Sequence, residues 1–264
     1  MNDDQFRKLL DQFGLSWQGY RKVRKGVIKR LVRHMQQLDI RDADIYVERI
    51  QSLPEIRRET QRLMTVSISR FFRDRSLWEY IKEKLIPEIL SSDPDQVNVW
   101  SAGCALGQEV YSFKMLWLLL DDESGPLPPL SLIGTDINRE YLDMAVSGVF
   151  SDHVIKEMPA NYLKRFFQYD QAQYFIAEEL KQNITWQLHD FTDKAPVNGP
   201  FHMIFLRNNL LTYYKKDSQE GPIRRLTETL TTGGYLIIGA HEKLLVDAPK
   251  LIRVDDYPGI YLKT

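Results

Sequence analysis

The sequence predicts an α/β fold in which an all-helical N-terminal domain precedes a Rossmann-like domain. VNVW, at 97–100, is typical of a buried strand, and a loop of small residues and an apolar helix over 107–120 follow it. A second apolar run, LSLIG, leads to Asp136. Strand, glycine loop, helix, strand and terminal acid form the opening unit of a nucleotide-binding sheet. Residues 3–90 instead show helical spacing of apolar side chains and few glycines.

The loop after the first strand indicates which kind of nucleoside would bind. A dinucleotide site needs G-x-G-x-x-G, because the pyrophosphate must approach backbone N–H groups at a helix N-terminus. This loop has only Gly103 and Gly107, and Glu109 stands where phosphate would lie. A carboxylate there repels phosphate but suits an ammonium group. S-adenosylmethionine (SAM) is such a ligand, with its ribose at Asp136 and its cationic methionyl end at Glu109.

Both acids also have ordinary structural interpretations. Glu109 would complement the dipole of the helix over 107–120. Asp136 would cap the next helix ahead of Asn138. Either interpretation is adequate for one residue alone, whereas the ordered pair in a strand–helix–strand unit favours the cofactor.

Composition bounds the class of protein. At 264 residues the chain can form one large or two modest domains, and its 43% hydrophobic and 27% charged residues are those of a soluble globular protein. The single cysteine, Cys104, excludes an intramolecular disulfide and favours a reducing compartment. The N-terminal segment MNDDQFRKLL is polar, so no secretory signal is expected. The longest apolar run, MLWLLL, is too short to span a membrane. We therefore expect a cytoplasmic location.

The two halves of the chain carry opposite charge. Residues 1–90 hold 19 Lys and Arg against 13 Asp and Glu, a net charge of +6, and residues 91–264 hold 16 against 23, a net charge of −7. The densest basic segment is RKVRKGVIKRLVR, which has no acid and only a narrow apolar stripe. Its basic residues are Arg21, Lys22, Arg24, Lys25, Lys29, Arg30 and Arg33. This density favours an acidic partner over a merely solvated face, and leaves nucleic acid open.

Turn residues and periodicity divide the chain further. The polar segment SSDPDQ, at 91–96, predicts a boundary between a helical domain over 1–90 and a second domain over 91–264. Helices are expected at 3–13, 20–38, 42–51, 54–63, after Ser69, and at 139–147, 159–167 and 218–230. Strands are expected at 201–208 and 235–242, with an antiparallel pair at the C-terminus. YFIAEEL and NITWQLHD alternate apolar and polar residues, which predicts a hairpin and a small β-subdomain over about 168–190.

Four motifs resemble the CheR family of chemotaxis-receptor methyltransferases. In order, they are SISRFFRD, WSAGCALGQEVYS, GTDINREYLDMAVSGVF, and IFLRNNLLTYY followed by GGYLIIGAHE. The second is highly specific, because ordinary methyltransferase loops lack the trailing E-x-Y-S. The resemblance covers almost the whole chain and implies a helical N-terminal domain, a Rossmann-like SAM domain and a small inserted β-subdomain.

The resemblance also implies the site. Cofactor contacts would fall on Ser67, Ser69, Arg73, Gly103, Glu109, Asp136, Asp190, Phe191, Arg207 and Asn208. Catalytic positions would be Arg73, which orients a carboxylate, and Thr212. Thr212 stands where the family usually has an active-site tyrosine, and Tyr213 would point the other way in an extended segment. Milder departures are Ser67 and Asp190, each in place of asparagine, and Ser69 in place of threonine.

Glutamate O-methylation, the reaction that the resemblance implies, requires few catalytic groups from the protein. An ionised carboxylate displaces the sulfonium methyl, so no general base is needed and positioning carries most of the rate enhancement. The basic segment resembles the family's surface for acidic receptor helices. The turn in FQYDQAQYF is short and has no glycine, so tethering of a receptor-tail peptide is not expected.

Two alternatives stay open. One is a non-catalytic adaptor that binds SAM or S-adenosylhomocysteine and docks a partner through its basic helix, which Thr212 suggests. The other is a CheR-like methyltransferase with another protein or nucleic-acid acceptor. The basic segment lacks interleaved aromatic residues for base stacking, which disfavours nucleic acid.

Overall fold

The computed structural model describes residues 1–264 except 68, 156–157, 193–198 and 245–247. The chain divides into two compact units, each with a hydrophobic core of its own. The first contains Met1–Ser67 and Asn208–Glu220, and the second contains Ile68–Arg207 and Gly221–Thr264.

The first unit is helical. It comprises α1 (Asp3–Gln12), α2 (Trp17–Tyr20), α3 (Arg24–Gln37), α4 (Ala43–Ser52), α5 (Pro54–Met64), the short α13 (Leu210–Tyr213) and a 3-10 turn, η2 (Lys216–Ser218). Fully buried side chains of Phe6, Leu9, Leu31, Tyr46 and Ile50 form the centre of its core. The helix predicted over 20–38 is confirmed as α3 over Arg24–Gln37, and a turn over 21–23 separates it from α2. The buried Tyr20 at the end of α2 donates its hydroxyl to the Met64 carbonyl at 2.9 Å.

The second unit is built on a seven-stranded sheet with the order β6-β2-β1-β7-β8-β10-β9. Its strands are β1 (Val97–Ala102), β2 (Leu130–Asp136), β6 (Ile184–Leu188), β7 (Phe201–Leu206), β8 (Leu230–Ile238), β9 (Leu251–Arg253) and β10 (Ile260–Lys263). The first five strands in the sheet order are parallel, and β10 is antiparallel to both of its neighbours. This topology confirms the Rossmann-like α/β prediction and the C-terminal antiparallel pair.

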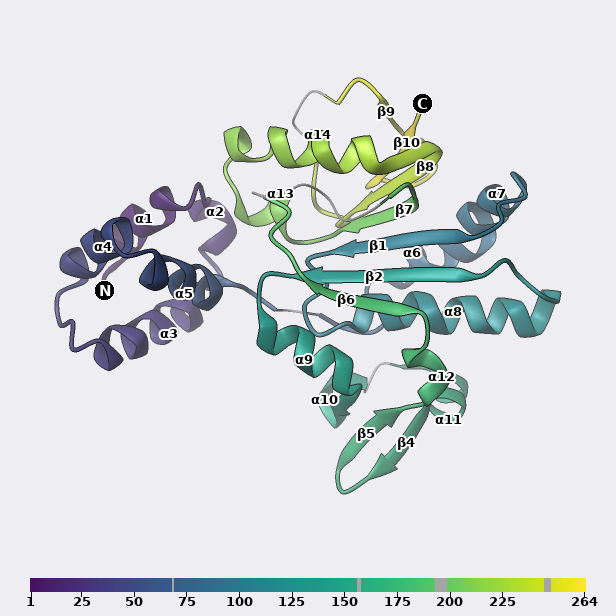
Figure 1. Ribbon diagram of the computed structural model, residues 1–264, viewed down its shortest axis with the longest axis horizontal. Coiled ribbons are helices and arrows are strands. Elements are labelled where there is room, and N and C mark those ends of the chain that lie inside the picture. The colour runs from purple at the N-terminus through teal and green to yellow at the C-terminus, as the bar shows by residue number, and fades with distance from the viewer. Residues whose placement is uncertain (68, 156–157, 193–198, 245–247) are drawn as a thin grey trace. The chain divides into compact units, whose positions relative to one another are not determined.

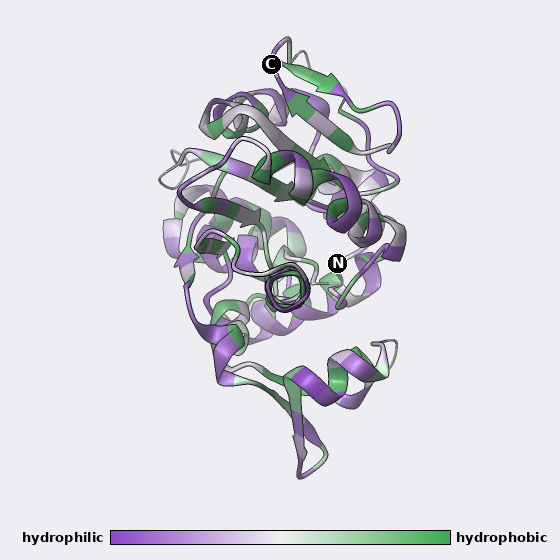
Figure 2. Ribbon diagram, turned by 90° about the vertical axis from the view of Figure 1, so that its right-hand side faces the viewer, coloured by the Kyte–Doolittle hydropathy of each residue, from purple (hydrophilic) through white to green (hydrophobic). Residues whose placement is uncertain are grey.

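Helices cover both faces of this sheet, with α8 and α14 on opposite sides (Figure 1). The helices are α6 (Arg75–Tyr80), the π-helix η1 (Ile81–Leu85), α7 (Ile86–Leu90), α8 (Gln108–Ser124), α9 (Arg139–Ser147), α10 (Asp152–Ile155), α11 (Ala160–Phe166), α12 (Glu178–Lys181) and α14 (Glu220–Thr229). Hydrophobic residues concentrate in the strands between them (Figure 2).

The compact units do not divide at 91–96, where the polar turn predicts a boundary. Leu77, Trp78 and Ile81 pack in the same cluster as Val97 and Val99 of β1. Apolar spacing marks these segments as helical, but it carries no information about which core the apolar side chains enter.

The hairpin predicted between 174–180 and 183–190 is wrong. β5 (Gln173–Ile176) lies between β3 (Val149–Ser151) and β4 (Phe167–Asp170) in a separate antiparallel sheet. β6 instead pairs in parallel with β2 at the edge of the main sheet. An edge strand has the same alternation of exposed and half-buried side chains as a hairpin strand, so the pattern alone does not separate the two.

Candidate functional site

The loop after β1 is fixed against the end of β2. The N–H groups of Gly103 and Cys104 both donate to the Thr135 carbonyl at 2.8 Å. The buried Trp100 donates its indole N–H to the Thr135 hydroxyl at 3.0 Å. Parallel strands present their carboxyl ends at one edge of a sheet, and these contacts hold the loop at that edge, where such folds bind ligands.

Gly107 ends the loop and begins α8. Its φ is +82°, a conformation that favours glycine, and an added Cβ would lie 2.8 Å from the Trp186 ring and 2.9 Å from Ala145 Cβ. Cys104 in the same loop is buried, and that burial, with smaller contributions from Asp136 and Glu109, raises its thiol pKa well above the ordinary value. This shift favours the protonated thiol over the nucleophilic thiolate at neutral pH.

Asp136 is the last residue of β2, and only 8% of its surface is exposed. One oxygen accepts the Ala105 N–H at 3.0 Å, and the other accepts the Asn138 N–H at 2.9 Å. Burial raises the Asp136 pKa, and the backbone donors oppose the shift. The cap of α9 is Asn138, which accepts from the Glu140 N–H, so Asp136 is not the N-cap residue.

A chain of charged groups lies beside this loop. Glu109, in the first turn of α8, accepts from the Ser101 hydroxyl at 2.8 Å and from Arg207 Nη1 at 2.9 Å. Arg207 follows β7, and its Nη2 donates to the Asp74 carboxylate at 2.6 Å and to the Arg73 carbonyl at 3.1 Å. Two carboxylates against one guanidinium leave a net charge of −1, which complements a ligand cation.

The chain after β6 lies next to Asp136. Leu188 pairs in register with Asp136, and the His189 N–H donates to the Asp136 carbonyl at 3.0 Å. Asp190 follows and accepts from the N–H and hydroxyl of Thr192, and Phe191 is buried. The ends of β1, β2 and β6 therefore bring their residues together at one edge of the sheet.

The match to known proteins runs through all of these elements. Residues 67–257 match the family described as CheR methyltransferase, SAM binding domain. The chain belongs to the CheR methyltransferase family. The resemblance seen in the four motifs is thereby confirmed.

Curated relatives agree with this family. An uncharacterized 104.1 kDa protein of Rhodobacter capsulatus is 30% identical over 225 residues, which are 83% of this chain and 23% of that protein. Chemotaxis protein methyltransferase 1 of Vibrio cholerae is 29% identical over 205 residues, 76% of this chain and 73% of the relative. Putative methyltransferase Cher3 of Pseudomonas putida is 28% identical over 252 residues, 92% of this chain and 89% of the relative.

S-adenosylmethionine is the cofactor of this CheR-family protein, and the residues at this edge of the sheet fit it. A carboxylate has about four acceptor positions, and the backbone N–H groups of Ala105, Ile137 and Asn138 do not fill all of those of Asp136, so hydroxyl donors can still bind there. Glu109 stands beside the loop in place of a glycine-rich phosphate site. The two carboxylates and one guanidinium of the charged chain have a net charge of −1, which suits the methionyl ammonium. The protein is a SAM-dependent methyltransferase.

The remaining expected site residues fall in different places. Ser67, Asn208 and Thr212 belong to the first unit. Thr212 lies in the helical turn α13 rather than in an extended segment, and the neighbouring Tyr213 packs its ring 5.1 Å from that of Tyr20.

Ser69 and Arg73 are half-buried residues that precede α6. The helix predicted after Ser69 begins only at Arg75, because Phe72 and Asp74 have positive φ angles of 48° and 62°. Sequence reasoning missed Asp74 and Ser101 as parts of the charged chain. The signal for Asp74 was its place directly after Arg73 in SISRFFRD.

In the part of the chain that the structure describes, no helix is both long and apolar enough to cross a bilayer.

Proposed function

We propose that this protein transfers the methyl group of SAM to glutamate side chains of a chemoreceptor or a receptor-like protein. The observation that carries the proposal is the CheR match over 67–257. This range includes Asp136 and the charged chain of Glu109, Arg207 and Asp74. Relatives named chemotaxis methyltransferases support the acceptor class.

The proposed cofactor contacts are those that the family resemblance implies. Asp136 would accept the ribose hydroxyls, Asp190 and Phe191 would contact the adenine, and Glu109 would pair with the methionyl ammonium. Gly103, Ser67, Ser69, Arg207 and Asn208 are proposed as further contacts. The bound cofactor supplies a sulfonium-activated methyl group.

The acceptor needs orientation more than acid–base chemistry. A glutamate carboxylate is ionised at neutral pH and attacks the methyl carbon directly. Arg73 is proposed to hold that carboxylate through its planar donors. Glu109 pairs with Arg207 at 2.9 Å, and the proposed reaction requires no proton shuttle.

The acceptor surface is proposed to be basic and to lie on and just before α3. Arg21, Lys22, Lys25, Lys29 and Arg33 are exposed there. Arg24 instead pairs with Asp3 at 3.1 Å, and Arg30 donates to the Leu63 and Thr65 carbonyls at 2.8 and 2.7 Å. Of the seven basic residues, the five exposed ones are therefore the proposed contacts for an acidic receptor helix.

The experiment is single-turnover transfer of a radiolabelled methyl group from SAM to purified receptor fragments. Glutamate methyl esters release methanol in mild alkali, which distinguishes them from N-methyl products. We expect alkali-labile label on wild type and its loss in Asp136→Ala, with S-adenosylhomocysteine affinity weakened by about 1–3 kcal/mol. Tight cofactor binding without transfer to any fragment would contradict the proposed acceptor.

That contrary outcome would favour a non-catalytic adaptor that binds the cofactor and docks a partner through α3. The observation behind this second candidate is Thr212, where the family usually has tyrosine. Transfer to another protein or to nucleic acid would indicate a redirected acceptor.

A further inference from the structure

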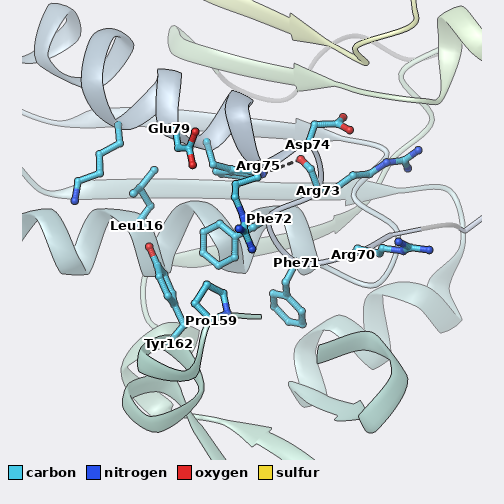
Figure 3. A pocket seen from close by; sticks show the side chains of 12 residues that line it. Arg70, Phe71, Phe72, Arg73, Asp74, Arg75, Glu79, Leu116, Pro159 and Tyr162 are labelled. Atoms are coloured by element: carbon cyan, nitrogen blue, oxygen red, sulfur yellow. Dashed lines mark hydrogen bonds between the residues drawn. The ribbon is translucent and has the colours of Figure 1, made fainter. Parts of the chain in front are cut away.

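A pocket lies in the second unit, apart from Asp136 and the other residues at the carboxyl edge of the sheet. It is a pocket of about 820 Å³ among the segment 70–75, α6, α8 and α11 (Figure 3). Gly103, Glu109, Asp136 and Asp190 do not line it, and the residues it shares with the charged chain are Arg73 and Asp74. Its volume is in the range of small-molecule sites.

Aromatic rings held in fixed positions form its wall. The Phe72 ring lies 4.7 Å from that of Tyr162 and 5.5 Å from that of Trp78, both edge to face. The Phe72 N–H donates to the Ser112 hydroxyl at 2.9 Å, and the Trp78 indole N–H donates to the Arg73 carbonyl at 3.0 Å. These contacts hold the rings before any ligand arrives, which lowers the entropy cost of binding.

The lining is also positively charged. Among the described residues that line the pocket, Arg70, Arg73, Arg75 and Lys82 outnumber Asp74 and Glu79 by two. Asp74 is paired with Arg207, and Lys82 with Glu123 at 2.9 Å. Within the described residues, Arg75 makes no ion pair and stands beside Phe72 at the pocket (Figure 3).

We propose that this pocket binds a small aromatic compound that carries a carboxylate. The ligand ring packs against Phe72, Trp78 and Tyr162, and Leu116 and Pro159 complete the apolar wall. Its carboxylate pairs with Arg75, whose planar donors match two oxygens. Glu79, one helical turn from Arg75 and also on the lining, weakens the attraction.

The test is calorimetric titration of the full chain with three probes. 1-Naphthylacetate has both the ring and the charge, 1-naphthylacetamide keeps the ring alone, and octanoate keeps the charge alone. We expect 1-naphthylacetate to bind about fivefold or more tightly than either other probe. Equal affinity for the three probes, or no binding of 1-naphthylacetate, overturns the proposal.

Paired variants identify the site. Arg75→Gln and Tyr162→Ala should each weaken 1-naphthylacetate binding by about fivefold, whereas Glu79→Gln should tighten it by about twofold. The gain in Glu79→Gln separates a direct effect from a folding defect, which could only weaken binding. Arg224→Gln, an exposed arginine on α14, is the charge-matched control and should change nothing.

Saturation with S-adenosylhomocysteine distinguishes the pocket from the cofactor site. Because the pocket shares only Arg73 and Asp74 with the proposed cofactor and acceptor site, the probe should still bind, with its affinity changed by less than about tenfold. Complete displacement overturns a separate site. The outcome is independent of methyl transfer, so it can fail while the proposed methyltransferase function holds.

Discussion

Arg207 and Asp74 form an ion pair at 2.6 Å although 133 positions separate them in the sequence. The Arg207 side chain is only 4% exposed, and its other terminal nitrogen pairs with Glu109. The segment that precedes α6 is therefore coupled to the first turn of α8. The net charge at the cofactor loop depends on a residue outside that loop.

Removing Asp74 should weaken cofactor binding. In Asp74→Ala the remaining Arg207–Glu109 pair is neutral, so the attraction for the ammonium of S-adenosylhomocysteine falls. We expect a three- to tenfold higher dissociation constant, about 1 kcal/mol, by calorimetry. Asp143→Ala, an exposed acid on α9, is the control. Equal loss in both variants would point to a general field effect instead.

Gly107→Ala should destabilise the fold by about 1–3 kcal/mol, because alanine would adopt φ +82° and meet Trp186 and Ala145. Gly26→Ala is the matched control. Nothing lies within 4 Å of a Cβ at Gly26, which is in α3. There, alanine should stabilise by about 0.5–1 kcal/mol. Urea unfolding of both variants measures the difference, and a Gly107→Ala protein as stable as wild type would show that the loop has room to shift.

Charge reversal on α3 should affect the acceptor and not the cofactor. For the double variant Lys25→Glu, Lys29→Glu, we expect the KM for a receptor fragment to rise about tenfold at low salt, with little change in S-adenosylhomocysteine affinity. The difference from wild type should shrink as salt is added. Arg224→Glu with Lys216→Glu gives a charge-matched control. If that control has the same effect, α3 is not the docking surface.

Thr212→Tyr tests whether the family tyrosine limits activity. The variant restores the phenolic hydroxyl of the family's tyrosine. If that hydroxyl orients the acceptor, kcat for receptor methylation should rise roughly tenfold, with cofactor affinity preserved. Thr212→Phe restores the ring without the hydroxyl and is the control. An unchanged rate in both variants would remove the reason for regarding Thr212 as a defect.

Stability should fall in mildly acidic solution because of His34. The ring is buried in the first unit, where its Nδ1 is 2.8 Å from the Tyr46 hydroxyl. Burial lowers its pKa from 6.5, and Glu59 opposes the shift. The unfolded chain then takes up the proton more readily, so the free energy of unfolding decreases as pH falls below about 6.5.

Urea unfolding at pH 7.5 and 5.5 measures this dependence. His34→Gln should reduce the difference between the two pH values. Part of it should remain, because burial also lowers the pKa of His202. A difference as large as in wild type would assign the pH dependence to other groups.

Local pattern was sufficient for much of the fold. The strand at 97–100, the loop with Gly103 and Gly107, and the acid at Asp136 follow from apolar runs and turn residues that act over a few positions. The helix over 139–147 and its end at Gly148 were predicted for the same reason, and Gly148 has φ +65°.

Pairing between distant segments was decided only by the tertiary structure. Residues 184–188 have the alternation of a hairpin strand, yet they pair with β2, and Leu77 and Trp78 enter the core of the sheet rather than that of the N-terminal helices. The sequence by itself determined the identity of the chemical groups, the helices and strands near them, and the CheR resemblance. Tertiary structure determined that Asp74, Arg207 and Glu109 form one charged chain, because burial and pairing energies depend on which segments meet in space and not on their spacing along the chain.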